Sequence, residues 1–220
     1  MKENQDFYFP ETDLTFHKIN CNKLSNDDCE IVSIINSWRS PEIFKYLLCE
    51  DKSAVLGSLY LYMARENKKH NNPCDFYCVF DGNSQEVIGT ALLAPNSHLN
   101  EVALERTSNF IIRNRNMRKS PAPLSYNDAL RLLESPSDGL FIMGFGVDPE
   151  KTGQGIGTQV IKTIDANLAF FNNNKSPSFN MCNIEMGNTA SKSIFYKENY
   201  KEFADRFWNN DFSTFYRINE

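Results

Sequence analysis

An apolar run, a glycine-rich loop and an amphipathic helix follow one another in the second half of the chain, and this succession most constrains the fold. Leu140–Val147 contains no charged residue, which is typical of a central strand buried on both faces. Lys151–Thr158 then has glycine at positions 153, 155 and 157. Apolar residues next recur at helical spacing, namely Ile156, Val160, Ile161, Ile164 and Leu168. The pattern predicts a strand, a loop and a helix in an α/β fold.

The glycine-rich loop is suited to binding a phosphate group. Glycine lets the backbone direct successive N–H groups at one anion, and the N-terminus of the next helix adds a partial positive charge. The chain has no Gly-x4-Gly-Lys-Ser/Thr string, which excludes the P-loop. Thr158 replaces the third glycine of a dinucleotide fingerprint. After so apolar a strand, we favour phosphate binding over a glycine-rich turn that binds nothing.

Residues 152–157 read Thr-Gly-Gln-Gly-Ile-Gly, which resembles the Arg/Gln-x-x-Gly-x-Gly/Ala signature of the GNAT superfamily of N-acetyltransferases. The resemblance implies a single-domain α/β fold of the GNAT-like acyl-CoA N-acyltransferase type, with a mixed central sheet flanked by helices. It also implies that the loop amides hold the pyrophosphate of acetyl-CoA and that the end of the strand pairs with its pantetheine. The implied CoA contacts are Phe145, Gly146, Val147, Thr152, Gly153, Gln154, Gly155, Ile156, Gly157 and Thr158.

A second segment, Asn188–Tyr200, resembles the helix Asn-x-x-Ala/Ser-x-x-Leu-Tyr-x-x-x-Gly-Phe of the same superfamily. The resemblance gives Asn188 a part in acetyl transfer and adds to the CoA contacts Asn188, Ser191 and Phe195. Counted without gaps, the tyrosine of the family falls on Phe195, with Tyr196 beside it. If the helix shifts by one residue, Tyr196 protonates the leaving thiolate; if the register holds, water does. We favour a catalytic part for Tyr196.

Acyl transfer to an amine needs a general base for the ammonium group and a backbone donor for the developing oxyanion. The splayed strand end at Gly146–Val147 is the expected donor. Many family members carry a Glu on this strand, whereas Met143–Gly146 contains no carboxylate. Glu185, near the end of the next predicted strand, is the candidate base, acting through water. An ordinary solvated charge at a strand end is the alternative interpretation of Glu185.

These residues predict an acetyl-CoA-dependent N-acetyltransferase that acts on a primary amine of a small molecule, a peptide or a protein. A non-catalytic module that binds acyl-CoA is the first alternative, and a nucleotide-binding regulatory module is the second. The first half of the chain resembles the branch that acetylates ribosomal-protein N-termini and aminoglycosides, through Leu14–Ile19, Asp27-Asp28 and Trp38–Ile43. Acetyl-CoA and the amine acceptor are the expected partners, no metal is expected, and a homodimer is left open.

The remaining sequence predicts one domain at residues 13–220, after an N-terminal extension at residues 1–12. Further strands are predicted at Leu14–Ile19, Phe76–Phe80, Val87–Leu93, Phe179–Met186, Phe203–Trp208 and Phe212–Ile218. An insertion at about residues 96–138 is rich in arginine. This insertion either borders the acceptor site or a partner, or is a packing excursion.

Composition excludes several classes of protein. The net charge of −5 argues against non-specific nucleic-acid binding. No apolar run approaches the about 20 residues that cross a bilayer, and the six cysteines lack the spacing of a secreted disulfide framework. We therefore expect a cytoplasmic protein without membrane or nucleic-acid partners. Cys74 and Cys78, near His70, lack zinc-site spacing and are predicted to be buried thiols.

Overall fold

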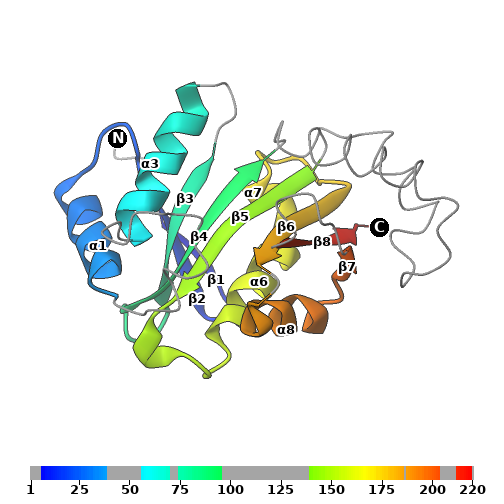
Figure 1. Ribbon diagram of the computed structural model, residues 1–220. Coiled ribbons are helices and arrows are strands. Elements are labelled where there is room, and N and C mark those ends of the chain that lie inside the picture. Colours follow the sequence, from blue (N-terminus) through cyan, green and yellow to red (C-terminus); the bar gives the residue numbers. More distant parts are fainter. Residues whose placement is uncertain are drawn as a thin grey trace, which may run out of the picture. The chain divides into compact units, whose positions relative to one another are not determined.

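The computed structural model describes residues 6–38, 56–69, 74–95, 139–185, 187–203 and 212–219 (Figure 1). The described strands are β1 (Asp6–Phe9), β2 (Leu14–Lys18), β3 (Asp75–Asp81), β4 (Val87–Pro95), β5 (Gly139–Val147), β6 (Phe179–Glu185), β7 (Lys201–Phe203) and β8 (Phe212–Ile218). The described helices are α1 (Asn26–Ser37), α3 (Leu56–Lys69), α6 (Ile156–Ala166), α7 (Leu168–Phe171) and α8 (Thr189–Lys197). Hydrogen bonding orders the strands β1-β2-β3-β4-β5-β6-β8-β7 in one mixed sheet, which confirms the predicted α/β class.

The chain divides into two compact units. The first contains residues 1–93 and 143–167, and the second contains residues 94–142 and 168–220. Strand β5 therefore contributes its last five residues to the first unit and its first four to the second. The predicted insertion at about residues 96–138 lies outside the described residues, as do the segments at 39–55 and 204–211.

In the first unit, β1 to β4 form an antiparallel meander. The turn between β3 and β4 is closed by the Asp81 carboxylate, which accepts hydrogen bonds from the N–H groups of Asn83 (3.0 Å) and Ser84 (2.8 Å). The strands predicted at Phe76–Phe80 and Val87–Leu93 are thus present and form a hairpin. Strand β1 lies within the segment assigned from the sequence to an N-terminal extension, and its four residues show too short an alternation to be recognised alone.

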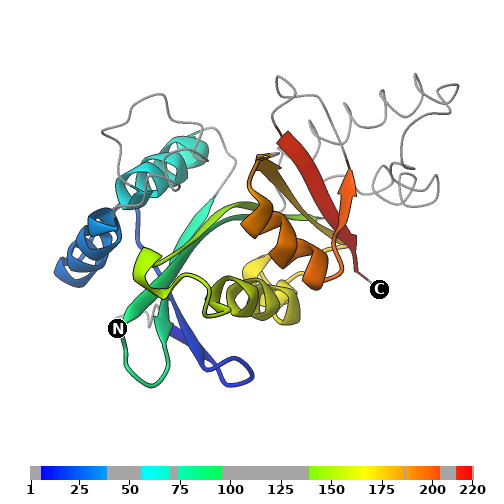
Figure 2. The same cartoon turned by 60° about the horizontal axis from the view of Figure 1, so that its bottom comes forward.

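The helices of the first unit cover both faces of its strands (Figure 2). A Cβ atom added to Gly146 would lie 2.9 Å from Cδ2 of Leu56 in α3, whereas one added to Gly89 would lie 3.7 Å from Cγ2 of Val160 in α6. Helix α3 therefore packs on one face and α6 on the other. The predicted apolar stripe of α6 is confirmed through Ile164, because these side chains are buried.

Two details differ from the sequence-based expectation. The helix that begins at Ile156 ends at Ala166, so Leu168 belongs to the short helix α7 and is only half-buried. The helix ends there because Asn167 leaves the helical conformation and its side-chain amide donates to the Thr163 carbonyl (3.0 Å). In β5, only the first half is buried; Met143–Val147 is partly exposed, although burial on both faces was predicted for the whole strand.

In the second unit, β6 runs parallel to the first four residues of β5 and antiparallel to β8. Helix α8 packs on β8 through Phe195, whose ring centroid lies 6.0 Å from that of Phe215. The short strand β7 pairs antiparallel with β8, in the register Lys201↔Tyr216. The two terminal strands predicted from the sequence are thus present and paired, but the first begins two residues earlier than predicted and is described only to Phe203.

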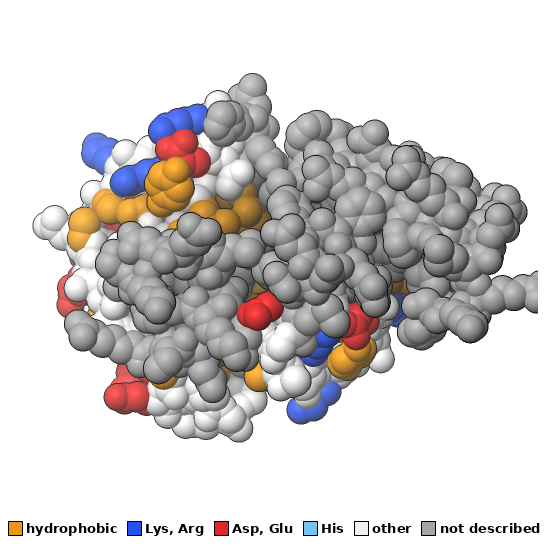
Figure 3. Space-filling view, in the orientation of Figure 1, with side chains coloured by type: hydrophobic (Ala, Val, Ile, Leu, Met, Phe, Trp, Pro, Cys, Tyr) orange, Lys and Arg blue, Asp and Glu red, His pale blue; other side chains and the backbone are white. Residues whose placement is uncertain are grey.

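On the face seen in Figure 3, acidic and basic side chains are interspersed over the part that the structure describes. Cys74 and Cys78 are buried, as predicted, and burial raises the pKa of Cys74 to about 12. His70 lies outside the described residues. Within the described residues, no helix is both long and apolar enough to cross a membrane.

Candidate functional site

The loop after β5 has the backbone geometry that its glycines predicted. The N–H of Asp148 donates to the Ile88 carbonyl of β4 (3.0 Å), which fixes the end of β5, and a single 3₁₀ turn follows at Pro149–Lys151. Gly153 and Gly155 have φ angles of 84° and 83°. A Cβ atom at either glycine would meet nothing within 4 Å. Glycine is therefore required here by the left-handed backbone and not by crowding.

The N-terminus of α6 leaves its amide groups open. Five backbone N–H groups of this segment have no hydrogen-bond acceptor within the described part of the chain, namely those of Gly153, Gly155, Ile156, Gly157 and Thr158. Gly155 is the N-cap and offers no side chain. By contrast, α1 and α8 are capped by the side chains of Ser25 and Asn188. The first turn of α6 also lacks an acidic residue. Open amides and the helix dipole together suit a phosphate group.

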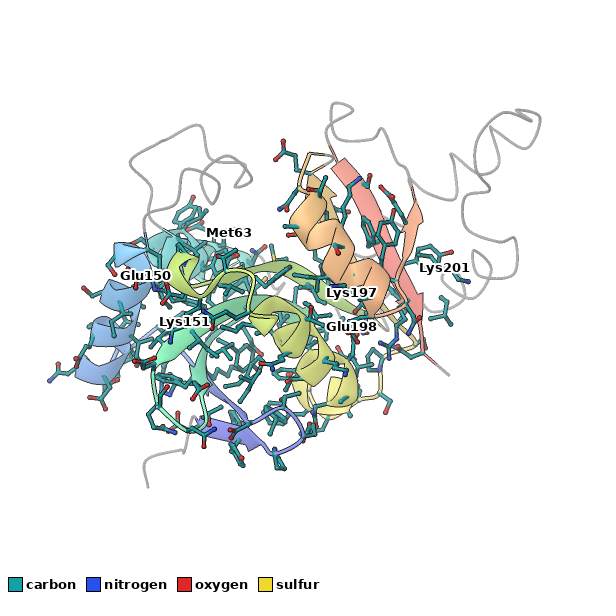
Figure 4. The ribbon with its side chains drawn as sticks, turned by 90° about the horizontal axis from the view of Figure 1, so that it is seen from below. Met63, Glu150, Lys151, Lys197, Glu198 and Lys201 are labelled. Carbon is teal, nitrogen blue, oxygen red and sulfur yellow. The ribbon has the colours of Figure 1, made fainter. Side chains whose placement is uncertain are left out.

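Charged side chains add little positive charge to this loop. Glu150 and Lys151 lie next to it, in the turn between β5 and α6 (Figure 4). The Lys151 ammonium is 2.5 Å from the Glu86 carboxylate, and this hydrogen bond raises the pKa of Lys151. Its positive charge is therefore partly balanced by Glu86. With Thr152 in place of the Arg or Gln of the signature, the attraction for an anion comes mainly from the backbone.

The register that pairs β5 with β6 covers the first half of β5. The parallel pairing of the two strands begins at Gly139↔Phe179 and ends at Ile142↔Cys182. From Met143 onward, no further register pair joins β5 to β6 within the described ranges. An extended ligand can add to a strand through backbone hydrogen bonds, as a further strand would. Phe145, Gly146 and Val147, the predicted pantetheine contacts, lie in this part of β5.

Helix α3 occupies the face of β5 on which Gly144 and Gly146 lie. A Cβ atom at Gly146 would approach Leu56, and one at Gly144 would collide with the Tyr60 hydroxyl. The strand therefore lacks a carboxylate here for a structural reason, since any side chain would displace α3. No motif or spacing in the sequence points to Leu56 and Tyr60, because only the packing of the chain brings α3 over β5.

The second motif forms a capped helix. The Asn188 side-chain oxygen accepts a hydrogen bond from the Ser191 N–H (3.0 Å), so Asn188 is the N-cap of α8. Phe195 is 1% exposed and contacts the Tyr200 ring edge-on at 4.9 Å. Asn199 has a φ of 63°, so it adopts the left-handed conformation expected where the family motif has glycine. The geometry of the segment thus follows the family motif.

Tyr196 points to the other side of α8. Its side chain is 50% exposed, and its hydroxyl donates a hydrogen bond to the Glu202 carboxylate of β7. Glu202 also accepts from the Lys192 ammonium (2.7 Å). The hydrogen bond to Glu202 raises the pKa of Tyr196 to about 12. The sequence could not reveal this contact, because it depends on where β7 pairs with β8.

We expect Tyr196→Phe to change the turnover number by no more than a factor of about two, because the Tyr196 hydroxyl is already hydrogen-bonded to Glu202. Steady-state kinetics with a working amine acceptor measures this. Lys192→Met, which removes the neighbouring ammonium, controls for disturbance of the Glu202 cluster. A fall of about 100-fold for Tyr196→Phe alone would restore Tyr196 as the acid, as favoured from the sequence.

Glu185 is the last residue of β6 and lies beside the N-cap of α8, since the Asn188 N–H donates to the Glu185 carbonyl (2.9 Å). One carboxylate oxygen, Oε2, is buried and has no hydrogen-bond partner within the described residues. Buried carboxylate oxygens are nearly always hydrogen-bonded. An oxygen in this state is available to a substrate amine or to a bridging water, which favours the base over the solvated surface charge.

Comparison with known proteins gives different results for the sequence and for the structure. No protein-family model matches the sequence, and no curated protein is significantly similar to it. Solved structures do match. An aminoglycoside acetyltransferase in complex with coenzyme A has a TM-score of 0.57 at 12% identity, with 93% of this chain and 94% of that chain covered.

Two further structures agree. The ribosomal-protein-S5-alanine acetyltransferase of Vibrio fischeri has a TM-score of 0.55 at 15% identity, with 98% of this chain and 97% of that chain covered. The GNAT domain of an S. lividans protein named PAT has a TM-score of 0.55 at 12% identity, with 94% and 90% covered. At such identities the likeness establishes the fold alone. The chain therefore has the GNAT acetyltransferase fold that its two motifs predicted.

Proposed function

We propose that the chain is an acetyl-CoA-dependent N-acetyltransferase that transfers the acetyl group to a primary amine of a small molecule, a peptide or a protein. The observation that carries this proposal is the N-terminus of α6, with its two left-handed glycines and its open amide groups. The GNAT fold and the coenzyme A bound to one structural neighbour support it. We assign the pyrophosphate to residues 152–158 and the pantetheine to the edge of β5 at Phe145–Val147.

In the proposed reaction the amine nitrogen attacks the thioester carbonyl carbon. A C–N bond forms, the C–S bond breaks, the nitrogen loses a proton and the CoA thiolate gains one. The N–H groups at the end of β5 are assigned to the developing oxyanion. Glu185 is assigned as the base that takes the amine proton, directly or through water, because its buried Oε2 has no partner within the described residues. With Tyr196 bound to Glu202, solvent is left to protonate the thiolate.

The chief alternative is a module that binds acyl-CoA without turnover. Two observations favour it: Met143–Gly146 carries no carboxylate, and the Tyr196 hydroxyl is already engaged by Glu202. The available oxygen of Glu185 favours the enzyme. Asn188 caps α8 through its side-chain oxygen. Its proposed part in acetyl transfer is therefore either to position this helix or to act through the NH2 group of its side chain.

Isothermal titration of the full chain with acetyl-CoA, ATP and NAD tests the ligand class. We expect one acetyl-CoA per chain, with competition by CoA and no saturation by either nucleotide cofactor. Saturation by ATP or NAD, with acetyl-CoA inert, would contradict the proposal and favour a nucleotide-binding regulatory module.

A further inference from the structure

Strand β6 carries two polar side chains near its C-terminal end that share one face. Along Phe179–Glu185, only Asn183 and Glu185 are partly exposed, and Ile184 between them is buried. Side chains of a strand alternate between its two faces, so those of Asn183 and Glu185 point to the same side, ~7 Å apart along the strand. The neighbouring strand β8 adds Thr214, which pairs with Asn183, to the same face.

Helix α8 covers the opposite face of these strands. Its Lys192 ammonium lies 3.2 Å from the hydroxyl of Ser213, and Ser213 is the residue of β8 that pairs with Ile184. The side chains of Asn183 and Glu185 alternate with that of Ile184 and therefore point away from α8. Solvent reaches part of each of these two side chains, so a small polar molecule can approach them without displacing α8.

A contact with β8 orients the Asn183 carboxamide. Its Oδ1 atom accepts a hydrogen bond from the Thr214 hydroxyl (2.9 Å). The NH2 group lies on the other side of the carboxamide carbon and therefore points away from Thr214. Within the described residues this NH2 group donates no hydrogen bond, although it carries two N–H donors. Asn183 thus presents a positioned, neutral donor on the face that it shares with Glu185.

Glu185 indicates that a ligand binds on this face. Its buried Oε2 has no hydrogen-bond partner within the described residues, and the proposed function assigns the acceptor amine to this oxygen. Two residues of β6 separate the carboxylate from Asn183 by ~7 Å, which is also the reach of two residues of an extended peptide. An acceptor whose amine lies at Glu185 can therefore place an oxygen at the NH2 group of Asn183.

We propose that Asn183 binds the acceptor by donating a hydrogen bond from its side-chain NH2 group to an oxygen of the amine substrate. The site then selects amines that carry a carbonyl or hydroxyl oxygen within ~7 Å of the reacting nitrogen, and disfavours plain alkylamines and polyamines. The inference rests on the proposed function, because Glu185 is the group that fixes the position of the amine.

The double variant Asn183→Leu/Thr214→Val tests the inference, because it removes the donor and leaves no buried hydroxyl without its acceptor. Three amines serve as acceptors: glycylglycinamide with carbonyl oxygens, aminobutanol with a hydroxyl, and pentylamine with neither. The kcat/KM of each oxygen-bearing amine is divided by that of pentylamine. We expect this ratio to fall about five- to tenfold for at least one of the two, while the Kd of acetyl-CoA is unchanged. A fall with glycylglycinamide alone assigns the bond to a carbonyl, and a fall with aminobutanol alone assigns it to a hydroxyl.

Thr214→Val alone is the matched control, since it keeps the Asn183 carboxamide, and its ratios should stay within a factor of about two of the wild type. Asn183→Asp is a second test that keeps an oxygen for Thr214, and it should lower the glycylglycinamide ratio at least as far, because a carbonyl then faces an acceptor. Ratios that stay at the wild-type value in both Asn183 variants, or an equal loss of acetyl-CoA affinity, overturn the inference.

Calorimetric titration of the CoA-saturated chain with the same amines measures the preference without turnover. If the wild-type chain acetylates no amine but binds an oxygen-bearing amine about five- to tenfold more tightly than the double variant does, the proposed function fails and Asn183 remains a binding residue. If amines are acetylated with ratios that do not depend on Asn183, the proposed function stands and this inference fails.

Discussion

Replacing Gly155 by Asp is expected to weaken acetyl-CoA binding by about 100-fold or more, equivalent to about 2.7 kcal/mol, without unfolding the chain. Gly155 is the N-cap of α6 and has a φ of 83°, a conformation that a side chain strains by roughly 1–2 kcal/mol. The new carboxylate would stand among the open amides and repel the pyrophosphate. Isothermal titration measures the affinity, and circular dichroism checks that the fold persists.

Two variants separate charge from backbone strain. Gly155→Asn adds a neutral side chain of the same shape, and asparagine tolerates the left-handed conformation, so its loss of affinity should be several-fold smaller. Asn173→Asp adds the same charge at an exposed left-handed position (φ 56°) outside the loop, and should leave the affinity unchanged. If Gly155→Asp binds acetyl-CoA like the wild type, the loop is not the phosphate site and the proposed function loses its basis.

Glu185→Gln is expected to lower the turnover number by about 100-fold or more while acetyl-CoA affinity stays unchanged. The amide has nearly the same shape but cannot take the proton of the attacking amine. Stability should hold or rise slightly, because no hydrogen bond is lost at Oε2 within the described residues. Turnover measured at saturating acetyl-CoA and amine reports the change directly.

The pH dependence identifies the role of Glu185. An alkylamine has a pKa near 10.4, so its free form becomes abundant as the pH rises and no longer needs a base. The ratio of wild-type to Glu185→Gln turnover should therefore shrink toward alkaline pH. Glu30→Gln, an exposed position on α1, is the control and should be silent. A ratio near one at neutral pH would return Glu185 to an ordinary solvated carboxylate.

The parts of the site that the sequence predicted are those encoded locally. The conformation of Gly153 and Gly155, the capping by Asn188 and the left-handed Asn199 each follow from a short run of residues. Strand, loop and helix could be placed for the same reason, because apolar spacing changes from strand to helix within twenty residues. Apolar runs between turn residues likewise placed the remaining strands.

The parts that could not be predicted depend on contacts between distant segments. Tyr60 reaches Gly144 from 84 positions away in the sequence, and no spacing rule connects them. The β5–β6 register ends at Ile142↔Cys182, which lie 40 positions apart in the sequence, and no residue pattern in β5 marks this end. The Tyr196 hydroxyl donates a hydrogen bond to Glu202, and this contact requires that β7, which begins at Lys201, places Glu202 beside α8. Tertiary packing decides all three.

Incubation of the full chain with acetyl-CoA and a panel of amines tests the central claim most directly. The panel should contain peptides with free N-termini, aminoglycosides and polyamines, and mass spectrometry should follow the products together with the free CoA thiol. We expect at least one amine to gain 42 Da, the mass of an acetyl group replacing hydrogen, with one CoA released per acetyl transferred and with loss of the signal in Gly155→Asp. Tight acetyl-CoA binding without an acetylated product from any amine would contradict the enzyme and leave a binding module.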